Sequence, residues 1–323
     1  MTAKIIVGDA LDMLKGLGSG IAQTCITSPP YWGLRDYGHE DQIGLEGSPQ
    51  EYVTKMVDVF REIRRVLKDD GTLWLNLGDS YAGARTAGGG TMNGFNDRYF
   101  DRTTDGGKQK EVDISKPARP AAVGLKPKDL IGIPWRVAFA LQEDGWYLRQ
   151  DIIWAKPNPM PESVTDRCTK SHEYLFLLSK SAHYYFDNEA IKEPTVTRDD
   201  TNRDRDSTRL NNVPGRTRMG GLKTNDYELR NKRDVWEIPT KPYSGAHFAV
   251  MPEDLVLPCI LAGSKPGDLI LDPFAGSGTV GVAALNCGRS FIGIELNEEY
   301  AGLAERRIFN DNPMFNVVER VIV

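Results

Sequence analysis

The sequence predicts an α/β fold in which a mostly parallel sheet carries helices on both faces. Two observations support this class: apolar runs rich in β-branched residues alternate with amphipathic helical patterns, and turns rich in glycine and proline separate them. A chain of 323 residues with 40% hydrophobic content is expected to form one large core with appended segments. Open parallel sheets bind ligands at the carboxyl ends of their strands, so the turns after the strands are the first candidate sites.

One such turn follows the apolar run 22–26 and reads Thr-Ser-Pro-Pro-Tyr-Trp-Gly at 27–33. Proline has no N–H and a φ fixed near −65°, so the strand cannot continue its ladder there. The chain becomes a stiff loop in which the carbonyls of Ser28 and Pro29 have no ladder partners. Two fixed acceptors beside the ring of Tyr31 suit a flat ring that bears an amine. A bare Pro-Pro pair more often ends a strand in an ordinary turn, and a second motif decides against that reading.

The second motif reads Asp-Pro-Phe-Ala-Gly-Ser-Gly-Thr at 272–279 and follows the strand 269–271. A small-residue helix over 280–285 comes next, and then a strand over 291–296 that carries Glu295. This βαβ unit has an acidic residue 23 positions after Asp272, where a ribose hydroxyl pair would be held. The third glycine of the dinucleotide-binding pattern is missing. The motif therefore indicates adenosine binding without pyrophosphate binding.

The other elements keep the same alternation. The run 4–7 predicts a strand that ends near Asp9, and Asp9 fits equally an N-cap for a helix over 10–15 and a ligand-binding position. We further expect a helix over 49–67, a strand over 72–77, a helix over 129–141, a strand over 146–154, a hairpin of 173–179 with 182–186, and helices from 252 and over 298–308. The neighbour of strand 291–296 should be the strand at 4–7. The fold is then circularly permuted, with its ends close together.

Two stretches, 82–128 and 194–243, break this alternation and are too rich in polar residues and glycine to form their own core. They hold nine basic against five acidic residues and eleven against eight, while the whole chain has a net charge of −5. The inserts therefore carry an excess of positive charge and the rest of the chain a larger negative excess. A basic nucleic-acid face on an acidic scaffold would produce this asymmetry, although solvated arginine-rich loops would also do so.

Together, the Thr-Ser-Pro-Pro-Tyr and Asp-Pro-Phe-Ala-Gly-Ser-Gly-Thr motifs resemble those of the DNA amino-methyltransferases that use S-adenosylmethionine. The catalytic motif precedes the cofactor motif, as in the permuted β class of that family. Ser28, in place of Asp or Asn, resembles the cytosine-N4 enzymes of restriction-modification systems or phages more than the adenine-N6 enzymes. The resemblance implies a circularly permuted, Rossmann-like methyltransferase fold with a seven-stranded, mostly parallel sheet, helices on both faces and irregular DNA-binding inserts.

On this resemblance the chain divides into a catalytic half of the core (1–81), a flexible basic insert (82–128), a continuation of the core (129–193), a target-recognition segment (194–243) and a cofactor-binding half (244–323). The implied catalytic residues are Ser28, Pro29, Pro30 and Tyr31. The implied cofactor-binding residues are Asp9, Asp272, Phe274, Gly276, Gly278, Thr279, Glu295 and Phe248. The implied contacts to the target base and DNA are Trp32, Trp154, Lys156, Asn158, Arg203, Arg205, Arg209, Arg216 and Arg218.

These residue types suit the transfer of a methyl group to an amine. If Ser28 and the Pro29 carbonyl accept the two N–H bonds of an exocyclic amine, its nitrogen lone pair becomes available, and no covalent intermediate is needed. A base inside a duplex must first be flipped out, and Tyr31, with Trp32, would stack on it. A carbon-5 cytosine enzyme would need a cysteine nucleophile after a proline, which the loop lacks.

Other classes stay open. Adenine-N6 methylation is the close alternative, because Ser28 divides the two groups imperfectly, and a protein or RNA methyltransferase could use a similar proline loop. A nicotinamide oxidoreductase would usually have the full Gly-x-Gly-x-x-Gly pattern, which this turn lacks. A catalytically silent DNA-binding module would tolerate the loss of Ser28, Asp272 or Glu295, yet all three residues are present.

The composition also bounds location and partners. No apolar run approaches the roughly 20 residues that a bilayer needs, so we expect a cytoplasmic protein without a membrane partner. The four cysteines form no Cys-x-x-Cys pair, and neither a metal site nor a disulfide framework is expected. Double-stranded DNA is the expected partner, and the resemblance also suggests a cognate restriction endonuclease and a homodimer.

Overall fold

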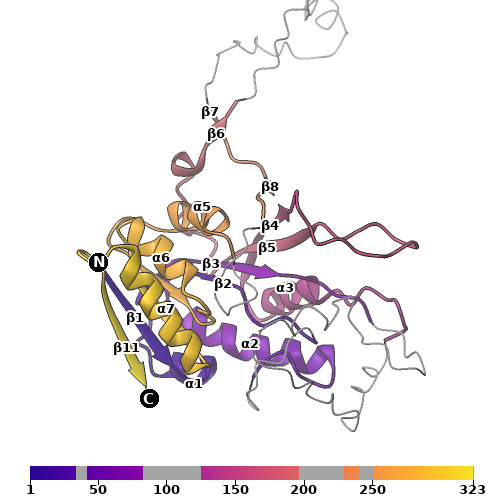
Figure 1. Ribbon diagram of the computed structural model, residues 1–323, viewed down its shortest axis with the longest axis horizontal. Helices are drawn as coiled ribbons and strands as arrows, with labels where there is room; N and C mark the ends of the chain where they lie inside the picture. The colour runs from indigo at the N-terminus through magenta and orange to yellow at the C-terminus, as the bar shows by residue number, and fades with distance from the viewer. Residues whose placement is uncertain (34–41, 83–124, 196–228, 241–250, 323) are drawn as a thin grey trace, which may run out of the picture.

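The computed structural model describes residues 1–33, 42–82, 125–195, 229–240 and 251–322. Their main feature is a nine-stranded sheet with the strand order β11-β1-β10-β9-β2-β3-β5-β4-β8 (Figure 1). The α/β class predicted from the sequence is confirmed. The expected number of seven strands is too low, because β8 (Val235–Glu237) and β11 (Val317–Ile322) add one strand at each edge. Both edge strands are largely exposed and give little sequence signal.

The sheet is mostly parallel. Parallel pairing joins β11, β1 (Thr2–Val7), β10 (Ser290–Glu295), β9 (Leu269–Asp272), β2 (Ala22–Thr27) and β3 (Leu67–Leu77) in turn. Only β5 (His172–Ser179), among the described strands of this sheet, runs antiparallel to its neighbours, β3 and β4 (Tyr147–Ala155). The carboxyl ends of the parallel strands thus meet at one edge of the sheet, which is where the two sequence motifs lie.

Helices cover both faces, as the sequence predicts (Figure 1). The helices α1 (Ala10–Lys15), α2 (Pro49–Val66) and α3 (Ile133–Glu143) pack their apolar residues into one core cluster. The helices α5 (Glu253–Gly263), α6 (Thr279–Asn286) and α7 (Glu298–Asp311) pack into a second cluster on the other face. These two layers bury the sheet and hold its strand ends in fixed positions.

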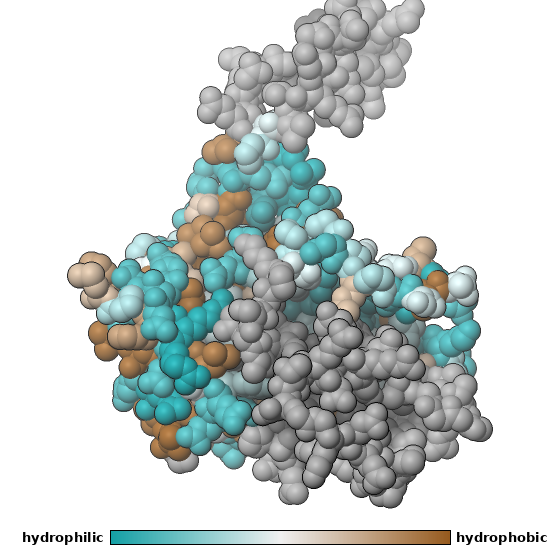
Figure 2. All heavy atoms as spheres, viewed as in Figure 1, coloured by the Kyte–Doolittle hydropathy of each residue, from teal (hydrophilic) through white to brown (hydrophobic). Residues whose placement is uncertain are grey.

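The circular permutation is confirmed, because β10 of the second half pairs directly with β1. The expectation that the chain ends lie close together is wrong. The strand β11 pairs with β1 in parallel, so Val317 lies beside Thr2 while Ile322 lies beside Val7 at the far end of the strand. Figure 1 shows the two ends of the chain at opposite ends of this strand pair. Met314, Phe315 and Val317 are exposed at the start of β11 and Ile322 is exposed at its end. Figure 2 shows hydrophobic side chains on this side of the molecule.

Two local predictions are also wrong. No strand forms over 182–186, because β5 pairs with β3 and β4 instead and the hydroxyl of Ser179 donates to the carbonyl of Ser181 to shape a turn. The helix expected from 129 begins at Ile133. Its N-cap, Gly132, has a φ of 77°, and the Asp79 carboxylate accepts hydrogen bonds from the N–H groups of Gly132 and Ile133. Pro134 therefore lies in the first turn, where its missing N–H costs nothing.

Most of the two inserts lies outside the described residues, at 83–124 and 196–228. The described remainder of the second stretch is partly built into the fold: β7 (Leu229–Arg230) pairs with β6 (Glu193–Pro194), and β8 joins the main sheet. Among the described residues, no helix has the length and apolar character to cross a membrane.

Candidate active site

The proline loop and the glycine-rich turn lie side by side. Their strands, β2 and β9, are neighbours in parallel register, with Cys25 opposite Leu271. The hydroxyl of Thr27 donates a hydrogen bond of 2.7 Å to Oδ1 of Asp272, although 245 positions separate the two residues. The two motifs that the sequence singles out therefore form one site.

Asp272 is almost fully buried at the bottom of this junction. Burial raises the pKa of its carboxyl to about 7, against the lowering effect of hydrogen bonds from Thr27 and from the N–H of Phe274 (3.1 Å). The negative charge of Glu295 raises the pKa further. A carboxyl that titrates near neutral pH in a buried position is typical of a functional site.

The glycine-rich turn is shaped by Glu295. The two oxygens of this carboxylate accept hydrogen bonds from the N–H groups of Gly276 (2.8 Å) and Asn297 (2.9 Å). Gly276 and Gly278 have φ angles of 51° and 78°, which favour glycine, and a Cβ on Gly278 would lie 3.0 Å from the Cβ of Ala304. The turn thus approaches neighbouring groups closely on bare backbone, as an adenosine-binding turn requires.

The sequence reasoning missed Arg307, whose hydrogen bonds to Ser277 and Thr279 stabilise this turn. Its guanidinium donates to the hydroxyls of Ser277 (3.1 Å) and Thr279 (2.8 Å) and to the carboxylate of Glu253 (3.0 Å). Arg307 therefore links α7, the turn and the start of α5. A lone arginine on an amphipathic helix carries no sequence signal for such a role.

On the other side of the junction, the proline loop is fixed at both ends. The hydroxyl of Tyr52 donates to the Pro30 carbonyl (2.9 Å), and the indole N–H of Trp32 donates to the Glu46 carbonyl (3.0 Å). Pro29 is buried, and Trp32 is only 7% exposed within the core cluster under α2. The burial of Trp32 leaves Tyr31 as the aromatic ring of the loop that faces the site.

Tyr31 is the centre of a polar network that joins the proline loop to β3 and β5. Its hydroxyl donates to Oε2 of Glu173 on β5 (2.7 Å) and lies 3.1 Å from Oδ1 of Asn76 on β3. The Ser28 hydroxyl lies 3.3 Å from the same Asn76 oxygen and 3.5 Å from the Tyr31 hydroxyl. Burial, and then the Glu173 charge, raise the pKa of Tyr31 well above its ordinary value. Tyr31 therefore stays neutral and can donate.

The ring of Tyr31 lies directly against the backbone at the end of β3. A Cβ added to Gly78 would come within 2.6 Å of the ring. The side-chain amide of Asn76 donates to the Tyr174 carbonyl (3.1 Å), which orients its oxygen toward Ser28 and Tyr31. Asn76, Gly78 and Glu173 are functional candidates that the sequence reasoning did not identify, because only strand pairing brings them to the proline loop.

Trp154, Lys156 and Asn158, which the resemblance implies as contacts to the target base and DNA, have different partners in the structure. Lys156 pairs with Oε1 of Glu173 and lies 4.2 Å above the ring of Trp154, so it belongs to the Tyr31 network. Trp154 is buried and donates to the Ile238 carbonyl (2.8 Å). Asn158 exchanges two hydrogen bonds with the backbone of Thr240 (3.0 and 2.9 Å). Trp154 and Asn158 therefore anchor β4 to the stretch around β8.

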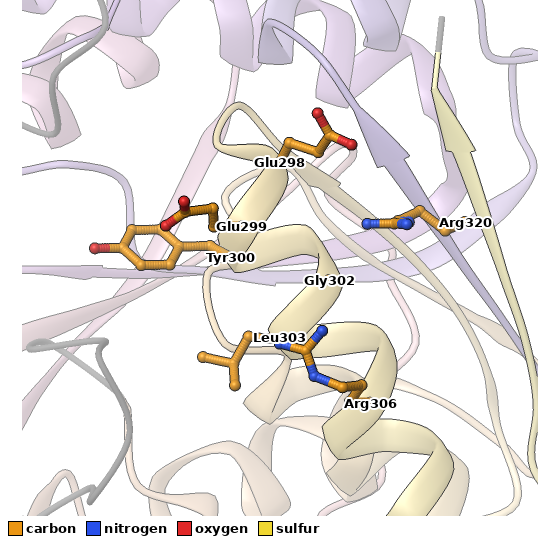
Figure 3. A pocket seen from close by; sticks show the side chains of 7 residues that line it. All are labelled: Glu298, Glu299, Tyr300, Gly302, Leu303, Arg306 and Arg320. Atoms are coloured by element: carbon orange, nitrogen blue, oxygen red, sulfur yellow. The ribbon is translucent and has the colours of Figure 1, made fainter.

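Asp9 caps α1, since its carboxylate accepts from the N–H of Asp12 (3.0 Å). It also follows β1, which pairs with β10, so it lies at the same edge of the sheet as Glu295. The remaining candidates, Phe248, Arg203, Arg205, Arg209, Arg216 and Arg218, lie outside the described residues. A separate hollow between α7 and β11, seen in Figure 3, is lined by Tyr300, Arg306 and Arg320 among others and by none of the predicted site residues.

Comparison with known proteins shows the family to which this chain belongs. The DNA methylase family model matches residues 22–306. The chain is 51% identical over 307 residues to the type II methyltransferase M.SmaI of Serratia marcescens, an alignment that covers 95% of this chain and 91% of the relative. It is 49% identical over 312 residues to the type II methyltransferase M.Cfr9I of Citrobacter freundii, covering 95% and 87%.

Solved structures share the fold. TTHA0409 of Thermus thermophilus, described as a putative DNA modification methylase and solved with S-adenosyl-L-methionine, has a TM-score of 0.60 at 22% identity and covers 99% of this chain and 98% of its own. The cytosine-N4-specific PvuII DNA methyltransferase has a TM-score of 0.59 at 16% identity, covering 99% and 95%. The chain belongs to the DNA methylase family, whose members include DNA methyltransferases of the N6-adenine and N4-cytosine type.

Proposed function

We propose that this protein transfers a methyl group from S-adenosyl-L-methionine to the N4 amine of a cytosine flipped out of double-stranded DNA. The observation that carries the proposal is the junction of Thr27 and Asp272, which joins the proline loop to the glycine-rich turn. A methyl donor at the turn and an amine at the loop would then meet without any large movement of the core.

The residues of the turn fit the methyl donor. Gly276 and Gly278 adopt the positive φ angles of a tight glycine-rich turn, and the Glu295 carboxylate is held at the end of β10, where a ribose hydroxyl pair would bind. Asp9 and Phe274 follow the strands β1 and β9 at this edge of the sheet, and Thr279 begins α6 directly after the turn. S-adenosyl-L-methionine supplies a methyl group already activated on a sulfonium, so the protein has to orient the amine and exclude water.

The proline loop fits the amine. Ser28 and the Pro29 carbonyl would accept its two N–H bonds, and the ring of Tyr31, fixed by Gly78 and Glu173, would stack on the flipped base. Lys156 would support the position of Tyr31 indirectly, because it pairs with Glu173, which accepts a hydrogen bond from the Tyr31 hydroxyl. Ser28 resembles the residue of the cytosine-N4 enzymes at this position, and this resemblance supports cytosine as the target.

Adenine-N6 methylation is the second candidate, because the family model covers both amines. The same geometry would serve, since both targets are exocyclic amines on flat rings. The methylated product distinguishes the two candidates.

The partner is double-stranded DNA, and we propose that the inserts 82–128 and 194–243, including the five arginines from Arg203 to Arg218, contact it. The type II names of the relatives support a role in a restriction-modification system, with a cognate endonuclease as a partner. Deleting 198–218 should abolish DNA binding and leave cofactor affinity nearly intact; unchanged DNA affinity would contradict this assignment.

The decisive experiment is methyl transfer to unmethylated genomic DNA, followed by digestion to nucleosides and mass analysis. N4-methylcytosine is the expected product. N6-methyladenine would overturn the base assignment and keep the site. The absence of any methylated nucleoside, with saturable cofactor binding, would point to an RNA substrate or to a missing partner and would contradict the proposal for this chain alone.

A further inference from the structure

We propose that Glu173 receives the proton that the target amine loses, passed through the hydroxyls of Ser28 and Tyr31. The inference rests on one part of the proposed function, which is that the protein methylates an exocyclic amine of DNA. It applies equally to cytosine and adenine. Glu173 acts through Tyr31 and makes no contact of its own with the base.

The path is a chain of three oxygen atoms. Ser28 Oγ lies 3.5 Å from the Tyr31 hydroxyl, and the Tyr31 hydroxyl donates to Glu173 Oε2 at 2.7 Å. The first step is long for a hydrogen bond, but catalytic contacts often shorten only when the substrate is bound. The second step is short and ends on a charged acceptor, so the single Tyr31 proton points toward Glu173 and not toward Asn76.

An amine that donates to Ser28 Oγ obliges the Ser28 proton to find another acceptor. Two are in reach: Asn76 Oδ1 at 3.3 Å and the Tyr31 hydroxyl at 3.5 Å. An amide oxygen is a poor base, so the Asn76 branch holds the Ser28 hydroxyl in place but carries no proton away. The Tyr31 branch ends at a carboxylate.

The surroundings of Glu173 suit an acceptor. Its side chain is 17% exposed, and its second oxygen accepts from the Lys156 ammonium, which is equally buried. This ammonium is the counter-ion of the carboxylate in a largely buried position. Lys170 and His172 also face the group, and burial, followed by nearby positive charge in the case of His172, lowers the pKa of both.

The step balances. As the bond between the amine nitrogen and the methyl carbon forms, the bond between that carbon and the sulfonium sulfur breaks, and its electron pair stays on sulfur to give a thioether. One N–H bond of the amine breaks and its proton goes to Ser28 Oγ. The Ser28 proton moves to the Tyr31 oxygen, and the Tyr31 proton moves to Glu173, which becomes a neutral carboxyl. Water at the exposed edge later removes that proton.

The test is single-turnover methylation of duplex DNA at saturating S-adenosyl-L-methionine, with wild type, Glu173→Gln, Glu173→Asp and Tyr31→Phe. The matched control is Glu189→Gln, which removes another Glu–Lys pair, at an exposed position outside the Tyr31 network. Binding of DNA and cofactor is measured on each variant, and 2-aminopurine at the target position reports base flipping by its fluorescence.

We expect Glu173→Gln and Tyr31→Phe each to slow methyl transfer by about 10²-fold, with affinities and base flipping unchanged. The double variant should be no slower than either single one, because one path is broken in both. Glu173→Asp should recover part of the rate, since aspartate is still a base.

A rate for Glu173→Gln within about threefold of wild type would refute the relay and leave the proposed function intact. Loss of base flipping or DNA binding in that variant would also overturn it, because Glu173 would then act by shaping the loop. Failure of wild type and Glu189→Gln to methylate any DNA would instead count against the proposed function itself. Tyr31→Phe provides an independent result if Glu173→Gln does not fold.

Discussion

Thr27 and Asp272 are joined by a hydrogen bond of 2.7 Å between two adjacent parallel strands, and this bond fixes the proline loop against the glycine-rich turn. The donor is a buried threonine at the last position of β2, and the acceptor is a buried carboxyl at the last position of β9. Each strand delivers one motif, and the bond sets their separation.

Replacing Thr27 with valine keeps the shape of the side chain and removes the donor. We expect Thr27→Val to lower the free energy of unfolding by about 2 kcal/mol, because a buried acceptor loses its partner. Urea denaturation measures the change. Thr54→Val is the control: its hydroxyl donates to a backbone carbonyl on the exposed face of α2, and a change within about 0.5 kcal/mol is expected. Equal losses in the two variants would contradict the importance of the junction.

The pKa of Asp272, raised to about 7, makes stability depend on pH. Below about pH 4 the carboxyl is protonated in both folded and unfolded chains. Between about pH 4 and pH 7 the folded protein keeps a proton that the unfolded chain has lost, so this group makes the protein less stable as pH rises through that range. Above about pH 7 the effect is complete and constant.

We therefore expect the free energy of unfolding of wild type, relative to Asp272→Asn, to fall by roughly 2 kcal/mol between pH 5 and pH 8. Denaturation curves of the two proteins at several pH values measure the difference, in which all other titrating groups cancel. Parallel curves for the two proteins would show that Asp272 titrates as an ordinary aspartate.

Gly78 tests whether the ring of Tyr31 must lie where it does. Because a Cβ at this position would lie 2.6 Å from the ring, we expect Gly78→Ala to displace Tyr31 and to reduce methyl transfer at least tenfold, with cofactor affinity unchanged. Gly16→Ala is the control, since a Cβ there would lie 3.4 Å from its nearest neighbour and its φ is −75°. Full activity of Gly78→Ala would argue against a defined position for Tyr31.

Glu295 tests the cofactor turn. Its two oxygens accept from the N–H groups of Gly276 and Asn297, and glutamine can satisfy only one of these with its carbonyl. We expect Glu295→Gln to weaken S-adenosyl-L-methionine binding at least tenfold in a calorimetric titration. Glu299→Gln, on the exposed first turn of α7, is the control and should bind like wild type. An unchanged affinity for Glu295→Gln would remove this residue from the proposed site.

The sequence by itself determined the α/β class, the permuted order of the two halves and the two motifs at strand ends. These features are local: prolines at 29 and 30 end a strand wherever it lies, and glycines at 276 and 278 permit a turn that other residues resist. Edge strands were missed for the same reason, since β8 and β11 have little apolar pattern of their own.

Only the tertiary structure decided which residues meet at the site. Glu173, Asn76 and Gly78 reach Tyr31 because β5 inserts antiparallel beside β3, and Thr27 reaches Asp272 because β2 pairs with β9 across most of the chain. Strand pairing is set by the burial of whole faces and not by any single residue. The sequence gives no sign that Glu173 is a site residue. It becomes the partner of the buried Tyr31 hydroxyl only when the sheet is assembled.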